Sequence, residues 1–340
     1  MPRSLQPLDH RTTHLTKTYK ADVHRFFLLV AGLSLATACW AQSYPAKPVR
    51  VVVPWPPAGV TDVLTRALVQ AMSESMGQQF VVENRPGAGG TLGLAPVAKS
   101  AADGYTLVAS DVPSHAISAT LYAKLPYDVL NDFEPIAMIA GSPMVLVTSP
   151  AIGAKTLGEF VKIAKASPGK LSYGSSGNGA ITHLGMERLK QLAGIDLVHV
   201  PYKGTVPAVA SVLSGDTVLA FGTIPGVVPH AKAGKLVMLG ASFGKRFSQI
   251  PEVPAIAETL LGFDMGFYTA LFAPAKTPKE VIDRLSLEVA KAHAQPKVRE
   301  IFANSAAEPG TMTPAQLKQY MASEVKAWGE VVRSVGLKVD

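Results

Sequence analysis

The chain has 340 residues, of which 48% are apolar and 17% are charged, and its formal net charge is +7. This length is enough for one large or two medium domains with a substantial core. The positive charge is spread along the chain without a basic run, which argues against nucleic-acid binding and suits a small anionic ligand.

The N-terminus is predicted to be an export signal. Several Arg and Lys residues precede the apolar run FFLLVAGLSLATACW, and a small-residue cleavage site follows near Ala41. The apolar run is short for a membrane span, which needs about 20 residues. We therefore expect a signal peptide over residues 1–41 and a periplasmic mature protein. A retained anchor helix and a lipoprotein acylated at Cys39 are the alternatives.

Cleavage at Ala41 would remove Cys39, which is the single cysteine of the sequence. The mature chain would then have no thiol chemistry, no disulfide and no cysteine-based metal site.

The first part of the expected mature chain alternates between strand and helix patterns. Residues 51–53 are a continuous apolar run typical of a buried strand, and residues 60–76 show helical spacing before Gly77 ends the helix. Further strands are expected over 79–84 and 104–110. This order favours a parallel sheet with helices on both faces.

The same alternation returns after residue 143. Strands are expected over 143–149, 170–176, 196–202, 217–222, 236–243 and 268–275, and helices over 156–167, 177–194, 205–215, 278–294 and 314–336. The chain is expected to cross between two lobes near 143 and 265. One lobe then holds residues 42–143 and 265–340, and the other holds 144–264. Two facing α/β sheet edges predict a ligand cleft between them.

Three strand-to-helix turns carry the chemistry that such a cleft needs. In PWPPAGVTD, the prolines keep the loop extended, Gly59 allows close approach to a ligand, and Thr61 or Asp62 is placed to cap the helix. Free N–H groups at a helix start favour an anion. The alternative is that Asp62 only caps and the prolines only stiffen the turn.

The other two turns lie in the second half of the chain. SYGSSGNGAITH places Ser175, Ser176 and Asn178 among glycines before a helix, with Thr182 and His183 one turn inside it. His183 could equally be a satisfied histidine of the core. VPYKGTVPA places Tyr202 and Lys203 at a third turn, where a lysine exposed to solvent is the alternative. Ser110, Ser114 and His115 end an earlier strand and are candidates for the rim.

Enzyme and dinucleotide motifs are missing from the sequence. The Gly-rich GAGGTL has Leu92 where the pattern G-x-G-x-x-G requires glycine. No G-x-S-x-G elbow, H-E-x-x-H pair or Walker A pattern occurs. We expect no catalytic residue, no cofactor and no metal, although a secreted hydrolase using the same cleft is a second hypothesis.

About 300 residues of the mature chain resemble the extracytoplasmic solute receptors of the tripartite tricarboxylate transporter family, also called Bug receptors. The resemblance lies in the segments VVENRPGAGGTLG, DGYTL, LPYDVLNDFEPI, YGSSGNG, VPYKG, AKAGKLVML, PEVPAIAE and LFAPAKTPKEVIDRL. It implies the two-lobed α/β periplasmic binding-protein fold of the second type (Venus flytrap) with two interdomain crossings. It also implies a monomeric, non-catalytic receptor for a small carboxylate, either a di- or tricarboxylate or an aromatic acid. The partners would be the integral membrane subunits of such a transporter or, alternatively, a sensor kinase.

The turns and the resemblance together predict a set of ligand-binding residues from both lobes. These residues are Trp55, Pro57, Ala58, Gly59, Thr61, Asp62, Ser114, Ser175, Ser176, Asn178, Thr182, His183, Tyr202 and Gly222. Three positions depart from the family pattern. The usual PPGG turn reads PPAGV here, so that Ala58 and Val60 narrow the loop, and Gly222 stands where an aspartate is common. The aspartate's absence disfavours amino-acid ligands, and Phe267 with Tyr268 could form a stacking wall.

Overall fold

The computed structural model describes residues 44–338 of the chain. The expected signal peptide, including Cys39 and the cleavage site at Ala41, lies outside the described residues. From Lys47 onward the chain forms one compact unit. Among the described helices, none combines the length and the apolar character that a membrane crossing requires.

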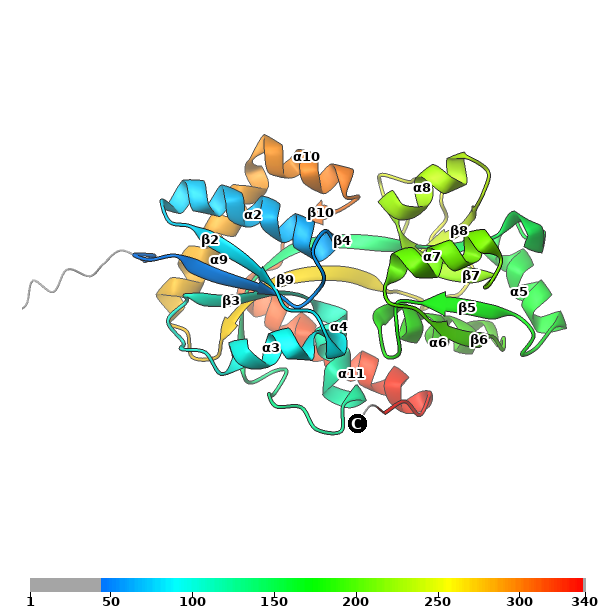
Figure 1. Ribbon diagram of the computed structural model, residues 1–340, viewed down its shortest axis with the longest axis horizontal. Coiled ribbons are helices and arrows are strands. Elements are labelled where there is room, and N and C mark those ends of the chain that lie inside the picture. The colour runs from blue at the N-terminus through cyan, green and yellow to red at the C-terminus, as the bar shows by residue number, and fades with distance from the viewer. Residues whose placement is uncertain (1–43, 339–340) are drawn as a thin grey trace, which may run out of the picture. The chain divides into compact units, whose positions relative to one another are not determined.

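Strands and helices alternate along most of this unit (Figure 1). The strands are β1 (Val49–Val53), β2 (Phe80–Asn84), β3 (Thr106–Asp111), β4 (Phe133–Thr148), β5 (Ser172–Ser175), β6 (Val198–Pro201), β7 (Leu219–Thr223), β8 (Val237–Ala241), β9 (Gly266–Pro274) and β10 (Glu308–Pro309). The α-helices are α2 (Val60–Met76), α3 (Thr91–Ala98), α4 (Val112–Leu121), α5 (Leu157–Ala166), α6 (Ile181–Ala193), α7 (Thr205–Ser214), α8 (Ile224–Lys232), α9 (Lys279–Ala294), α10 (Pro296–Asn304) and α11 (Pro314–Ser334). Short 3₁₀ turns are η1 (Ala88–Gly90), η2 (Pro150–Ile152) and η3 (Ile256–Glu258).

The sheet is mixed, which corrects the expectation of a parallel sheet. Its strand order is β2-β1-β3-β9-β4-β7-β5-β6, with β8 and β10 also pairing with β4. Strands β1, β2 and β3 pair in parallel, as do β5, β6 and β7. Strands β4 and β9 pair antiparallel with each other and with their neighbours β7 and β3. The antiparallel pairs arise where the chain passes from one group of parallel strands to the other.

Strand β4 runs through both groups of strands and divides the sheet into two lobes. It pairs with β9 as far as Pro143↔Gly266 and with β7 from Met144↔Thr223 onward. We call the group formed by β1–β3, β9 and the first part of β4 the first lobe, and the group formed by β5–β8 and the rest of β4 the second lobe. Strands β4 and β9 run between the two groups in Figure 1. The fold is therefore the expected two-lobed α/β fold.

Local sequence explains why most elements begin and end where they do. In β1 the valines are buried, as the continuous apolar run predicts. Helix α2 buries Leu64, Leu68 and Met72 on one stripe and ends at Gly77, whose φ of 68° is the left-handed conformation that glycine adopts most easily. The sequence boundaries of this helix were therefore predicted to within one residue.

Three helices and half of one strand were not predicted. Helix α4 buries nearly all its residues and so has no amphipathic period, while α8 contains two prolines and α10 follows α9 directly. Strand β4 begins at Phe133, ten residues before the expected start at 143. Extensive burial explains the missed α4, whereas α8 and α10 bury only two residues each.

Candidate functional site

A cavity of about 710 Å³ lies between the two lobes. Its wall is built mainly from loops that lead from a strand into a helix. Helices α2, α4, α6, α7 and α8 all reach it with their first turns, through Val60, Ser114, Ile181, Thr205 and Ile224. The cavity therefore lies at the carboxyl ends of the parallel strands, where open α/β sheets bind ligands.

Four of these helices begin at the cavity without a side-chain cap. Gly59, Ala180 and Gly204 are the N-cap residues of α2, α6 and α7, and they have no side chain that could accept a hydrogen bond. Thr223 precedes α8 and, within the described chain, its hydroxyl makes no cap bond either. The first N–H groups of a helix have no partner inside it and form the positive end of the helix dipole. Their convergence from both lobes is suited to an anion.

The rest of the wall is largely apolar. Its larger apolar members are Trp55, Pro56, Pro57, Ile117, Leu121, Tyr122, Met144, Val206, Ile224 and Phe267. Among the described lining residues, Lys203 is the one basic and Asp111 the one acidic side chain. Such a cavity suits a small anion with an apolar body. In the described part of the chain, no group of three or more His, Cys, Asp or Glu side chains is placed to hold a metal ion.

The loop before α2 is held by a network centred on Asp62. Asp62 Oδ2 accepts from the Ala58 N–H at 2.9 Å, and its two oxygens accept from Arg66 Nε at 3.0 Å. Asn84 Nδ2 donates to Asp62 Oδ1 at 2.8 Å and to the Trp55 carbonyl at 3.1 Å. Burial alone would raise the pKa of Asp62, but these hydrogen bonds lower it below the usual value on balance. Asp62 thus holds the loop before α2 in place through these hydrogen bonds.

The loop before α6 is held by its own polar side chains. Thr182 Oγ1 accepts from the Ser176 N–H at 2.8 Å and lies 2.8 Å from the Ser176 hydroxyl. His183 Nδ1 accepts from the Gly179 N–H at 3.1 Å, and the His183 ring stacks on His199 with centroids 3.7 Å apart. His183 therefore supports the loop and does not face the cavity.

Nine of the predicted site residues line the cavity, and the other five do not. Those in the wall are Trp55, Pro57, Ala58, Gly59, Thr61, Ser114, Ser176, Asn178 and Thr182. Those that do not line it are Asp62, Ser175, His183, Tyr202 and Gly222. Of the proposed aromatic wall, Phe267 lines the cavity, whereas Tyr268 stacks on Phe243 at 5.6 Å.

Gly222 is a packing residue in this chain. A Cβ built at this position would lie 2.4 Å from Val227 Cγ1 and 2.7 Å from Val209 Cγ2. No side chain fits there without movement of these valines, which explains how glycine can replace an aspartate. Tyr202 is also set back: its N–H donates to the Ser175 carbonyl at 2.9 Å, and its ring packs against the core of the second lobe.

One serine–histidine pair bears on the hydrolase hypothesis. Ser175 Oγ lies 2.6 Å from His199 Nε2, a distance suited to a nucleophile and its base. However, Ser175 is fully buried and does not line the cavity. Burial is the main cause that lowers the pKa of His199 to about 4, so the ring is neutral. The pair supports the loop before α6, and a substrate in the cavity would not reach it.

Sequence reasoning missed several polar residues of the wall, among them Asp111 and Ser142. Asp111 is fully buried, and burial is the main cause that raises its pKa to about 6. The signal that could have found it is an aspartate at the end of a strand, two residues before Pro113, which is typical of a helix N-cap. Ser142 lies inside β4 and carries no local signal. His115, expected at the rim, is instead fully buried against Phe133 and Phe272.

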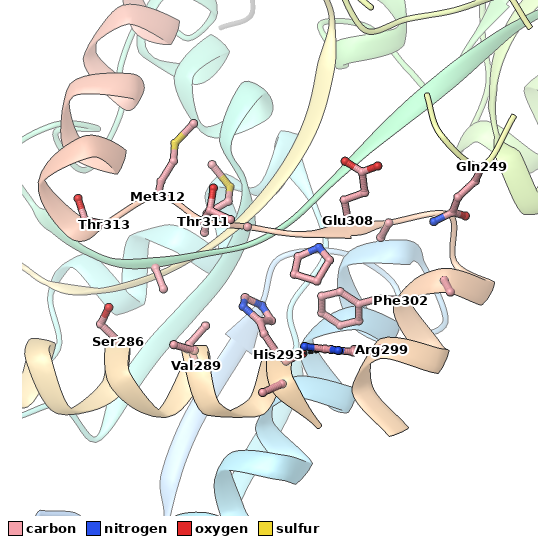
Figure 2. Close-up of a pocket in the computed structure, with 18 residues that line it drawn as sticks. Gln249, Ser286, Val289, His293, Arg299, Phe302, Glu308, Thr311, Met312 and Thr313 are labelled. Atoms are coloured by element: carbon pink, nitrogen blue, oxygen red, sulfur yellow. Dashed lines mark hydrogen bonds between the residues drawn. The ribbon is translucent and has the colours of Figure 1, made fainter. Parts of the chain in front are cut away.

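A second cavity of about 700 Å³ lies in the first lobe (Figure 2). Figure 2 shows its wall formed by side chains of α9 and α10 and by the segment that leads into α11. Arg299 Nε donates to the His293 carbonyl at 3.2 Å, and Thr313 caps α11 through a full capping box. The volumes of the two cavities are almost equal, so the free helix N-termini distinguish the cavity between the lobes as the candidate anion site.

Residues 64–337 match the family model described as "Tripartite tricarboxylate transporter family receptor". Protein BugT of Bordetella pertussis is 36% identical over 321 residues, which cover 92% of this chain and 98% of BugT.

Two solved structures from Rhodopseudomonas palustris are also similar. Rpa4515, described with adipate, is 30% identical with a TM-score of 0.79, and the match covers 87% of this chain and 100% of that one. MatC, described with bound malate, is 31% identical with a TM-score of 0.75, and the match covers 85% of this chain and 100% of that one.

Proposed function

Because this chain belongs to the tripartite tricarboxylate transporter family of periplasmic solute receptors, we propose that it captures one small carboxylate in the cavity between its lobes. In this proposal it then delivers the ligand to the integral membrane subunits of such a transporter. It releases the ligand unchanged. The adipate and malate named for the two similar structures are both carboxylates, which supports this class of ligand.

The observation that carries the proposal is the meeting of uncapped helix N-termini at one cavity. Helix α2 contributes from the first lobe, and α6, α7 and α8 contribute from the second. A carboxylate held there would accept several charge-assisted hydrogen bonds, each worth about 1.5–3 kcal/mol. A few such bonds would supply much of the roughly 8 kcal/mol that corresponds to micromolar binding.

We place the boundary between the lobes at the two crossings expected from the sequence, near 143 and 265. The change of β4 from β9 to β7 as its partner falls between Pro143 and Met144, which supports the first crossing. A hinge at these strands would let the lobes close on the ligand, so that N–H groups from both sides reach it.

Isothermal titration calorimetry of the mature protein tests the proposal. The panel contains succinate, malate, adipate, citrate, benzoate and 4-hydroxybenzoate, each beside its neutral amide. We expect at least one acid to bind with a Kd in the micromolar range and its amide to bind at least about 10-fold more weakly, because the helix N-termini favour the charged form.

Two serine variants test whether the acid binds in this cavity. Ser176→Ala removes a hydroxyl from the cavity wall and should weaken binding of that acid severalfold. Ser323→Ala, on the exposed side of α11, removes a hydroxyl that bonds only the Tyr320 carbonyl and should change nothing. Failure of every acid to bind, or equal binding of acids and amides, would contradict the proposal.

A further inference from the structure

Three buried polar atoms in the wall of this cavity have no hydrogen-bond partner among the described residues. They are Trp55 Nε1, Asp111 Oδ2 and Ser142 Oγ. The indole nitrogen can only donate, an ionised carboxylate can only accept, and the hydroxyl can do both. A buried polar group without a partner is costly, so atoms of this kind gathered in one cavity point to a ligand that satisfies them.

Asp111 already uses one of its two oxygens for the fold. It is the last residue of β3 and the N-cap of α4, and Oδ1 accepts from the Ser114 N–H at 2.8 Å. Oδ2 is buried and has no hydrogen-bond partner among the described residues. The groups that act on this carboxyl are Ser114, Trp55 and its own backbone, and no cation of the described chain is among them. The indole of Trp55 is close enough to contribute, but its N–H makes no hydrogen bond of standard geometry.

This arrangement makes α4 different from the other helices at the cavity. Helices α2, α6, α7 and α8 begin without a hydrogen bond from an N-cap side chain, whereas at the start of α4 the Asp111 carboxylate accepts from the Ser114 N–H. A ligand carboxylate would be attracted to the free N-termini and repelled by Asp111. The ligand must therefore turn its charged end away from α4 and present a different group to Asp111.

The two atoms Trp55 Nε1 and Asp111 Oδ2 specify that group. A second carboxylate could accept from Trp55 but would lie against the charge of Asp111. An ammonium could donate to Asp111 but would leave Trp55 Nε1 without an acceptor. A hydroxyl can accept from the indole and donate to the carboxylate at the same time.

We propose that the ligand is a hydroxy acid whose hydroxyl bridges Trp55 Nε1 and Asp111 Oδ2 while its carboxylate lies at the free helix N-termini. Asp111 is then the residue that determines specificity for the hydroxyl. The apolar part of the ligand lies between these two ends, along Ile117, Leu121 and Phe267. This inference rests on the proposed carboxylate-binding function and goes beyond it by naming the second recognised group.

Matched ligand pairs test the inference by calorimetry on the mature protein. The pairs are malate with succinate and 4-hydroxybenzoate with benzoate, and the amino analogues are aspartate and 4-aminobenzoate. In at least one set, the hydroxy acid should bind at least about 10-fold more tightly than the acid that lacks the hydroxyl. Without the hydroxyl, Trp55 Nε1 and Asp111 Oδ2 would stay unpaired when the acid binds. It should also bind more tightly than the amino analogue.

Two variants assign the preference to the named atoms. Asp111→Asn retains an oxygen to cap α4 but turns an amide toward the cavity, and it should reduce the preference for the hydroxy acid to about threefold or less. Trp55→Phe leaves the cap untouched and removes only the indole donor, and it should also lower the preference. Asp103→Asn makes the same change of charge at an exposed position outside the cavity and should leave the preference unchanged.

The outcomes separate this inference from the function on which it rests. If acids bind but the wild-type protein prefers neither member of a pair, or if Asp111→Asn and Trp55→Phe both keep the full preference, the hydroxyl assignment is wrong and carboxylate binding stands. Tighter binding of an amino analogue would likewise overturn it. If none of the acids binds, both proposals fail together.

Discussion

At the scale of single residues, two positions lead to predictions about stability: Asp111, which lines the cavity, and Gly222, which does not. Asp111 is fully buried with one oxygen free, and burial raises its pKa to about 6 from an ordinary value of 3.8. A carboxyl with this shift binds a proton more readily in the folded than in the unfolded chain. Its contribution to stability is therefore present at low pH and is lost as the pH rises through about 6.

Asp111→Asn should stabilise the protein at neutral pH, because asparagine caps a helix as well as aspartate does and never ionises. The shift of about two pKa units corresponds to a gain in unfolding free energy of up to ~3 kcal/mol at pH 7.5. At pH 4.5 the gain should shrink to about 1 kcal/mol. Urea unfolding of both proteins at the two pH values measures it, and a gain independent of pH would contradict the explanation.

Gly222 offers a prediction about packing. Gly222→Ala places a methyl group against Val227 and Val209 and should lower the unfolding free energy by about 1–3 kcal/mol. Val227→Ala in the same chain makes room for this methyl group. The double variant should therefore lose less stability than the sum of the two single variants, as urea unfolding would show. Full additivity of the losses would mean that the two side chains do not meet.

At the scale of elements, two loops at the cavity are held in part by side chains that do not line it. Asp62 holds the loop before α2, and His183 holds the loop before α6. Ala58 has a φ of 63°, a left-handed conformation that costs a non-glycine residue roughly 1–2 kcal/mol. The hydrogen bond from its N–H to Asp62 helps to hold it in this conformation. Thr182 differs from Asp62 and His183, because it both lines the cavity and holds the loop before α6 through Ser176.

Asp62→Ala should weaken binding of the panel acid that binds most tightly by about 10-fold, although Asp62 does not line the cavity. The reason is that the Ala58 N–H loses its acceptor and the loop is no longer held in its conformation. Asp62→Asn retains an oxygen for Ala58 and should keep most of the affinity. Equal losses in the two variants, measured by calorimetry, would instead indicate a direct role for the charge.

Local sequence patterns predicted some of the helices at the cavity and missed others. The amphipathic α2 and α7 and the turns at Gly59 and Gly204 follow from apolar spacing and glycine placement, and they were predicted nearly to the residue. Helix α4 was not predicted because burial on all sides removes its period. Because α4 was not predicted, the N-cap signal at Asp111 was not used, and this polar residue of the cavity wall was missed.

At the scale of the whole unit, β4 and β9 are the strands that run between the lobes, and the cavity proposed as the ligand site lies between those lobes. We expect the lobes to close when the tightest-binding acid of the panel is added. Small-angle X-ray scattering should show a smaller radius of gyration with this acid than with its neutral amide at the same concentration. An unchanged radius at saturation would mean that binding needs no hinge motion.

The sequence by itself determined the family, the alternation of strands and helices, and the loops whose glycines leave helix N-termini free. These features depend on residues close together in the chain, so local patterns carry them. The tertiary structure decided which loop residues line the cavity and that β4 and β9 make the sheet mixed. It also decided that Asp111, Trp55 and Ser142 line the cavity, each with one buried polar atom that has no hydrogen-bond partner among the described residues. These depend on contacts between distant segments, because burial and the direction of a side chain are set only when the lobes are packed.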